Sequence, residues 1–188
     1  MGDKYASRVI GSKQAVEPFG LGGLWTFRCV RPDGSIRWED QWKNILVNQG
    51  KLRALNNLFT GSAQITSWYV GLLTDNTGWT AGVHTYTVTD IAGFDFQGYS
   101  NSTLPQWTPL STPSMNGNIG EIQNTSPMAF NIDTNGSVIG GAFLCSSNVK
   151  ATPGGELYAY GQWVGGANKN ADSGDVLQVT ATMTATSP

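Results

Sequence analysis

The chain has 188 residues, of which 39% are hydrophobic and 11% aromatic, so it can bury the core of one domain and does not require a second. Charged residues make up only 13%, about half the usual share, and two cysteines are too few for a disulfide scaffold or a cysteine metal site. The first residues hold no apolar run and no stretch approaches transmembrane length, so we predict no signal peptide and no membrane contact, with synthesis in the cytoplasm.

The charge is unevenly distributed along the chain, although the net charge is only −2. Up to Arg53 there are nine Lys and Arg against five Asp and Glu, a balance of +4. From Ala54 onward there are two against eight, a balance of −6. The basic residues are interspersed with acids and form no cluster, so we expect a protein partner and no nucleic acid.

Residues 1–23 show neither helical nor strand periodicity. They mix small, basic and isolated apolar residues and end in a stretch rich in Gly and Pro. A segment of this composition cannot bury enough apolar surface to order itself, so we predict a flexible, extended N-terminal arm. Its apolar residues exceed what a linker requires, which favours an arm that docks on a neighbouring subunit; the alternative is a disordered leader.

From Leu24 apolar residues alternate with polar ones. Trp25, Phe27 and Cys29 share one face of a strand, and the sequence R-P-D-G at residues 31–34 separates them from a second alternating stretch that includes Trp42. Two strands joined by such a turn form a β-hairpin. Cys29 and Cys145 both lie in apolar strand patterns, so we expect reduced core thiols.

Residues 48–60 form the only helix that the sequence predicts. Asn48 favours a helix N-cap and Gly61 can end the helix. Between them apolar residues recur at helical spacing: Leu52, Leu55, Leu58 and Phe59. The stretch that follows, residues 65–74, is apolar on both faces of an extended chain and predicts a central strand buried on both sides.

Turn residues divide the rest of the chain into short alternating stretches. We predict strands over residues 85–90, 119–123, 127–132, 137–146, 156–164 and 175–186, a hairpin turn at 133–136 and a long surface crossing at 101–118. Eight or nine strands with one short helix predict an all-β protein. We expect an antiparallel β-sandwich, jelly-roll-like, as a single domain over residues 24–188.

No motif in the chain predicts an active site. His84 is the only histidine, and no G-x-S-x-G sequence is present to supply a nucleophile. Most carboxylates lie at predicted turns or strand ends, where acids serve turn formation. The D-x-N-G sequence at residues 133–136 begins like a calcium loop but has no distal Glu. We therefore expect no enzyme, with no catalytic residue, metal or cofactor.

Exposed aromatic side chains on a β-sandwich can stack on sugar rings. The candidates for such a stripe are Trp79, Trp107, Tyr158 and Tyr160. Placing most of the seven tryptophans in the core is the simpler interpretation. A carbohydrate-binding module that recognises host glycans therefore remains an alternative.

Several segments together resemble a small structural protein of tailed-bacteriophage particles, in the same order over residues 25–186. The two most specific are N-Q-G-K-L-R-A-L leading to S-W-Y-V-G-L, and the strand G-A-F-L. The others are R-P-D-G-S-I-R-W-E-D, M-A-F-N-I-D-T-N-G, G-E-L-Y-A-Y-G-Q-W and G-D-V-L-Q-V-T-A-T. The resemblance implies a virion component, above all a capsid decoration or cement protein, with no catalytic residue to transfer.

The same resemblance implies a place on the capsid surface of the virion. The expected partners are the major capsid protein and copies of the chain itself, a trimer being one arrangement. We expect the arm to bind acidic capsid surface, oriented by its basic residues and partly buried through its apolar ones. These candidates are Lys4, Arg8, Lys13, Phe19 and Leu21. A component of the tail, baseplate or fibre is the alternative within the virion.

Overall fold

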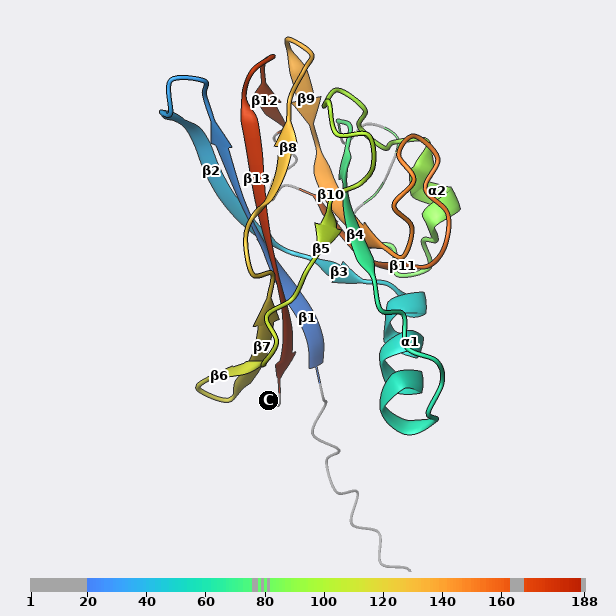
Figure 1. The fold of residues 1–188 in the computed structure, drawn as a ribbon. Helices are drawn as coiled ribbons and strands as arrows, with labels where there is room; N and C mark the ends of the chain where they lie inside the picture. The colour runs from blue at the N-terminus through green and yellow to red at the C-terminus, as the bar shows by residue number, and fades with distance from the viewer. Residues whose placement is uncertain (1–19, 76–77, 79, 81, 163–167, 187–188) are drawn as a thin grey trace, which may run out of the picture.

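The structure is a computed structural model that describes residues 20–75, 78, 80, 82–162 and 168–186. Its strands form two antiparallel sheets that pack face to face, with a two-stranded ribbon at one end (Figure 1). The prediction of an all-β antiparallel sandwich with a short helix is confirmed. The remaining residues, which include most of the predicted arm, lie outside the described part.

The first sheet is built on two eleven-residue strands, β1 (Gly20–Val30) and β13 (Val176–Thr186). They pair antiparallel along their whole length, from Gly20 opposite Thr186 to Val30 opposite Val176. β2 pairs with the other edge of β1, so the predicted hairpin is confirmed. β7 and β8 pair with β13, and β6 pairs with β7. The bounds are β2 Ile36–Lys43, β6 Ser114–Asn116, β7 Ile119–Gln123 and β8 Met128–Asn131.

The second sheet has shorter strands, in the order β3-β11-β10-β4-β5, and none of them exceeds six residues. Their bounds are β3 Ile45–Leu46, β4 Trp68–Leu73, β5 Gln106–Trp107, β10 Gly141–Cys145 and β11 Leu157–Gln162. β9 (Ser137–Ile139) and β12 (Lys169–Ala171) pair separately. The predicted hairpin at residues 133–136 is wrong, because this turn joins β8, which pairs with β13, to β9, which pairs with β12.

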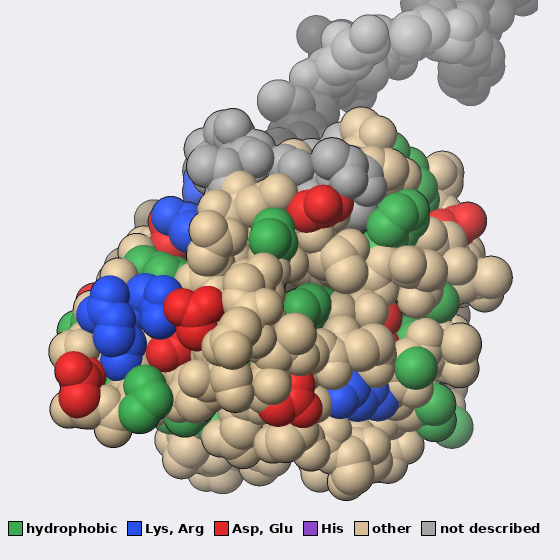
Figure 2. Space-filling view, turned by 90° about the horizontal axis from the view of Figure 1, so that it is seen from above, with side chains coloured by type: hydrophobic (Ala, Val, Ile, Leu, Met, Phe, Trp, Pro, Cys, Tyr) green, Lys and Arg blue, Asp and Glu red, His purple; other side chains and the backbone are tan. Residues whose placement is uncertain are grey.

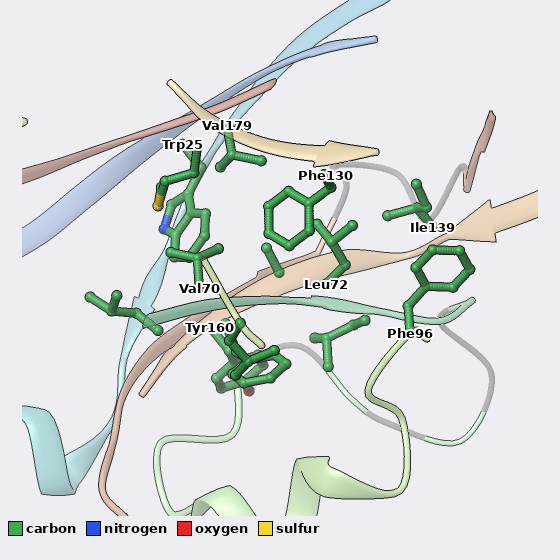
Figure 3. Packing of buried hydrophobic residues seen from close by; sticks show 14 of the residues in the cluster. Trp25, Val70, Leu72, Phe96, Phe130, Ile139, Tyr160 and Val179 are labelled. Atoms are coloured by element: carbon green, nitrogen blue, oxygen red, sulfur yellow. The ribbon is translucent and has the colours of Figure 1, made fainter. Parts of the chain in front are cut away.

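The core lies between the two sheets and is rich in large side chains. Trp25, Phe130 and Val179 of the first sheet point toward Val70 and Leu72 of the second (Figure 3). Each of these five residues is fully buried. Burial of these and the other core side chains supplies apolar contact that holds the sheets together.

The outer face of the second sheet is also covered, which explains why β4 is apolar on both sides. Residues 70–73 of β4 are all buried. On this outer face lie Tyr160 and a short helix, α2 (Val88–Ala92), whose Val88 and Ile91 are buried (Figure 3). The sequence predicted a strand over residues 85–90, and this prediction is wrong because Thr87 and Asp90 form a capping box that starts a helix.

The predicted helix is present as α1 (Asn48–Phe59). Its N-cap is Val47, not Asn48, and no side chain caps this end. The first amide group is instead satisfied by a tertiary contact: Asn48 N–H donates to the carbonyl of His84 at 2.8 Å. α1 is therefore fixed at its start by the neighbouring loop.

The predicted boundary of the arm at residue 23 is wrong. Residues 20–23 belong to β1 and pair with residues 183–186 of β13. Three of these four residues are Gly, so the sequence shows no alternation of apolar and polar residues here. The strand was therefore not predicted to begin before Leu24. The domain therefore includes Gly20, and Leu21, which the sequence analysis predicts to bind a partner, is a strand residue.

Gly71 offers a test of the buried second sheet. A β-carbon at this position would overlap the ring of Phe143, which lies across the strand pair on Gly71. We expect Gly71→Ala to lower the free energy of unfolding by about 1–3 kcal/mol, because the fully buried ring of Phe143 or the backbone would have to shift. Urea denaturation measures the change.

Gly93 provides the matched control for this substitution. It has a φ of −68°, and a β-carbon there would meet nothing within 4 Å. Gly93→Ala should change the unfolding free energy by no more than about 0.5 kcal/mol. Equal effects of the two substitutions would contradict the packing described for β4 and β10.

Candidate interaction surface

The described residues hold no cluster of three or more metal-ligating side chains. The single histidine, His84, is exposed, and its Nδ1 lies 3.0 Å from the carbonyl oxygen of Leu46. Within the same part of the chain, no helix has the length and hydropathy needed to span a bilayer. The candidate site is therefore a surface.

The carboxylates hold the fold together at separate places. Asp90 closes the capping box of α2, and Glu156 forms a bidentate ion pair with Arg53 of α1. Asp172 and Asp175 both pair with Arg37, at 2.9 and 2.8 Å. Each of these four carboxylates therefore has a structural role.

Both cysteines are buried and reduced, as the sequence predicted. Burial raises the pKa of Cys29 to about 12, and the neighbouring carboxylate of Asp175, 3.7 Å from the sulfur, adds to the effect. Burial also raises the pKa of Cys145 to about 12. Both thiols are therefore protonated at neutral pH and are poor nucleophiles.

The predicted exposed aromatic stripe is wrong for two of its members. Trp107 is buried and its indole N–H donates to the carbonyl of Ala181 at 3.0 Å. Tyr160 is fully buried, and its hydroxyl bonds to the backbone of Val83. Tyr158 is half-buried with its ring edge against Trp68. Trp79 lies outside the described residues.

Of the five predicted partner-binding residues, only Leu21 is described. Lys4, Arg8, Lys13 and Phe19 lie outside the described residues. Leu21 lies near the start of β1 opposite Ala185 and is half-buried. Its surroundings lead to a surface that the sequence did not reveal.

The core-facing side of the first sheet continues past the end of the second sheet. In β13 the inward positions are buried up to Ala181 and then become half-buried at Met183 and Ala185. The strand register places Leu21 beside Ala185 and Ile122 beside Met183 on the same face. The end of the first sheet thus presents an apolar face with no sheet opposite it, at the lower end in Figure 1.

Helix α1 exposes most of its apolar side chains. Leu52, Leu58 and Phe59 are 61%, 64% and 79% exposed, and Leu55 is 45% exposed. We call these four residues the helix stripe. Gly50, the buried residue of the helix, lies two positions before Leu52 and so about 200° away around the axis. The helix therefore packs on the domain through one side and leaves the helix stripe uncovered by the core.

Three contacts fix this orientation. A β-carbon at Gly50 would overlap the carbonyl group of Tyr158 in β11, so only glycine allows the helix to come this close. The side-chain oxygen of Gln49 accepts the N–H of Leu157 at 3.2 Å. Arg53 donates its Nε–H to Glu156 at 2.9 Å. Polar groups and a glycine hold α1, and its leucines are left for another surface.

A groove runs between the apolar end of the first sheet and α1. A pocket of about 180 Å³ beside Trp68 and a pocket of about 260 Å³ beside Leu21 share the walls Ile122, Tyr158 and Met183. A third pocket of about 350 Å³ lies between Leu21 and Leu55. We call this continuous feature the end groove, because it opens at the end of the sandwich.

The basic residues in the described part of the chain do not form a basic face. Arg28 pairs with Glu39, and Lys169 pairs with Asp40 at 2.8 Å. In Figure 2 the Lys and Arg side chains on the opposite end of the molecule lie beside Asp and Glu, on a surface that is mostly uncharged. The end groove and the helix stripe are consequently the most distinctive surface of the described chain.

Comparisons with known proteins give no family to guide the assignment. No family model matches the chain, and no curated protein is significantly similar to it. The interpretation of the end groove and helix stripe therefore rests on their own geometry.

The sequence contained a partial signal for this surface. The alternation of β13 runs on through Met183 and Ala185, and the helix carries four large apolar residues over eight positions. Periodicity identifies which residues share a face. It does not reveal whether another layer covers that face, and so the end groove was missed.

Asp95 is a buried carboxyl group whose pKa is raised. Only 7% of it is exposed, and burial raises its pKa from 3.8 to about 6, against opposing effects of the Ala151 N–H and Lys150. The folded state therefore binds this proton more tightly than the unfolded state. The contribution of Asp95 to the free energy of unfolding is therefore fully present below about pH 4 and is lost as the pH rises through 6.

We expect Asp95→Asn to remove this pH dependence. Relative to wild type, the variant should gain up to about 3 kcal/mol of unfolding free energy between pH 4 and pH 7, since two pKa units correspond to that amount. Urea denaturation of both proteins at the two pH values measures the difference. An equal difference at both pH values would contradict the burial effect at Asp95.

Proposed function

We propose that this chain is a non-enzymatic structural protein of a virion, a capsid decoration or cement protein that binds and stabilises the lattice of the major capsid protein. The observation that carries the proposal is the helix stripe, four large apolar side chains held outward on a helix whose other side is anchored. The resemblance of several segments to phage particle proteins supports the same assignment.

The helix stripe fits a protein that works in an assembly. Monomeric soluble proteins rarely leave a contiguous apolar patch of this kind uncovered, and such patches mark interaction sites. Burying one leucine or phenylalanine contributes about 1.5–3 kcal/mol, so four give a useful contact. Repeated over many symmetry-related positions on a particle, weak contacts sum to stable attachment.

The N-terminal residues supply a second, electrostatic contact in this proposal. Lys4, Arg8 and Lys13 meet acidic capsid surface and Phe19 adds apolar contact. Leu21 is assigned to the wall of the end groove, because it lies in β1. The chain acts at the capsid surface with copies of itself, and a trimer at three-fold positions is one arrangement.

A tail, baseplate or fibre component would use the same surface at far fewer positions. The carbohydrate-binding alternative loses two of its four candidate aromatic residues, because Trp107 and Tyr160 are buried. Copy number on the particle separates the capsid from the tail assignment.

We expect the chain to be present in purified particles in a fixed, high ratio to the major capsid protein, measured by gel densitometry. Leu58→Asp with Phe59→Asp should lower this ratio several-fold, because two charges replace apolar contact at the helix stripe. Val149→Asp is the matched control, since Val149 is 49% exposed outside the end groove and helix stripe.

A few copies per particle would move the assignment to the tail. The absence of the chain from particles, or equal ratios for the two variants, would overturn the proposed capsid contact. Circular dichroism of both purified variants establishes that a lower ratio does not come from unfolding.

A further inference from the structure

We propose that the end groove binds residues 1–19 of a second copy of this chain, taken up as an extended segment along the free edge of β1. The inference goes beyond the proposed function, since it concerns how copies join and not which particle they join. It rests on the shape of the end groove, on the open edge of β1 and on the position of the segment in the chain.

The end groove is an unfilled extension of the core. Leu21, Ile122 and Met183 line one side, and Tyr158 and Leu55 line the other. In the closed part of the sandwich, the corresponding inward side chains, such as Trp25 and Ala181, are fully buried between the two sheets. An apolar segment that enters the end groove would bury its walls in the same way.

The backbone beside the end groove is open to another strand. β2 pairs with β1 only from Leu24 to Val30, and the Asn44 N–H donates to the carbonyl of Gly23 at 3.0 Å. No strand of the described chain pairs with this edge at residues 20–22. An extended peptide can add to such an edge through main-chain hydrogen bonds, with alternate side chains filling adjacent pockets.

Residues 1–19 have the composition and the location that this site requires. They join β1 at Gly20, which itself lines the pocket between Leu21 and Leu55. They include the adjacent β-branched pair Val9 and Ile10, which favours extended structure, and only two acids. The segment is thus apolar enough for the end groove and attached at its rim.

The distance along the chain favours a second copy over the same molecule. Ile10 and Gly20 are ten residues apart, which spans roughly 33–36 Å when extended. The overhang from Trp25 to Gly20 is five residues, roughly 17 Å of strand. The β-branched pair therefore lies about twice as far from Gly20 as the end groove extends, and reaches a neighbour without folding back.

The first experiment titrates a labelled peptide of residues 1–19 against the chain 20–188, which keeps every described residue, and follows fluorescence anisotropy. We expect saturable binding, weakened by about tenfold or more by Leu55→Asp in the domain, since a charge would replace apolar contact in the end groove. Val149→Asp should bind as wild type. In the peptide, Val9→Ser with Ile10→Ser should abolish binding, whereas Lys4→Ser with Lys13→Ser should retain it.

The second experiment measures molar mass by light scattering during size-exclusion chromatography. The full chain should associate, whereas the chain 20–188 and the full-length Leu55→Asp variant should each be monomeric. Mixed together, these two should form a heterodimer, because one supplies the segment and the other supplies an intact end groove.

Failure of the peptide to bind the chain 20–188 would overturn the proposal. If the full chain is monomeric and no longer binds added peptide, its end groove is occupied by its own residues 1–19. That result would overturn the proposal that a second copy supplies the segment. Association that persists without residues 1–19 would assign the contact to another surface, such as the helix stripe. None of these results depends on particle binding, so they leave the proposed function to its own test.

Discussion

The difference in strand length between the two sheets is the constraint on which this structure depends. β1 and β13 pair along eleven residues, whereas the strands of the second sheet reach at most six. At about 3.3 Å per residue the first sheet extends well beyond its partner. The alternation that builds the core continues into this overhang, so Met183 and Leu21 face inward with no opposing sheet. An interior surface is thereby carried to the end of the molecule, where another chain can reach it.

The second wall of the same region depends on one glycine. Gly50 lets α1 approach the backbone of Tyr158, and Arg53 and Gln49 secure the helix through polar contacts. A helix of this amphipathic sequence usually turns its leucines to the core. Here the anchoring residues lie on the other side, which leaves the leucines available for binding. Overhang and helix together make one apolar end on a domain whose remaining surface is mostly uncharged or carries paired charges.

The sequence predicted the sandwich, the first hairpin, the helix and the doubly buried β4, because each has a clear period or turn signal. It failed where tertiary context decides. The stretch at residues 85–90 alternates like a strand, yet the capping pair of Thr87 and Asp90 makes it a helix. Trp107 lies among prolines and polar residues like a surface residue, yet its indole finds the carbonyl of Ala181 in the core. The end groove was beyond prediction, because a pattern shows which residues share a face and not what covers that face.

The central claim is that the apolar end of the first sheet is covered when copies assemble. Oxidation of methionine by dilute peroxide, read by mass spectrometry, tests it directly, because Met183 lines the end groove whereas Met128 is only 5% exposed in the core. In the dilute, isolated chain Met183 should oxidise much faster than Met128. In the assembled protein the account predicts that Met183 becomes nearly as protected as Met128. Oxidation of Met183 at the same rate in both states would contradict it.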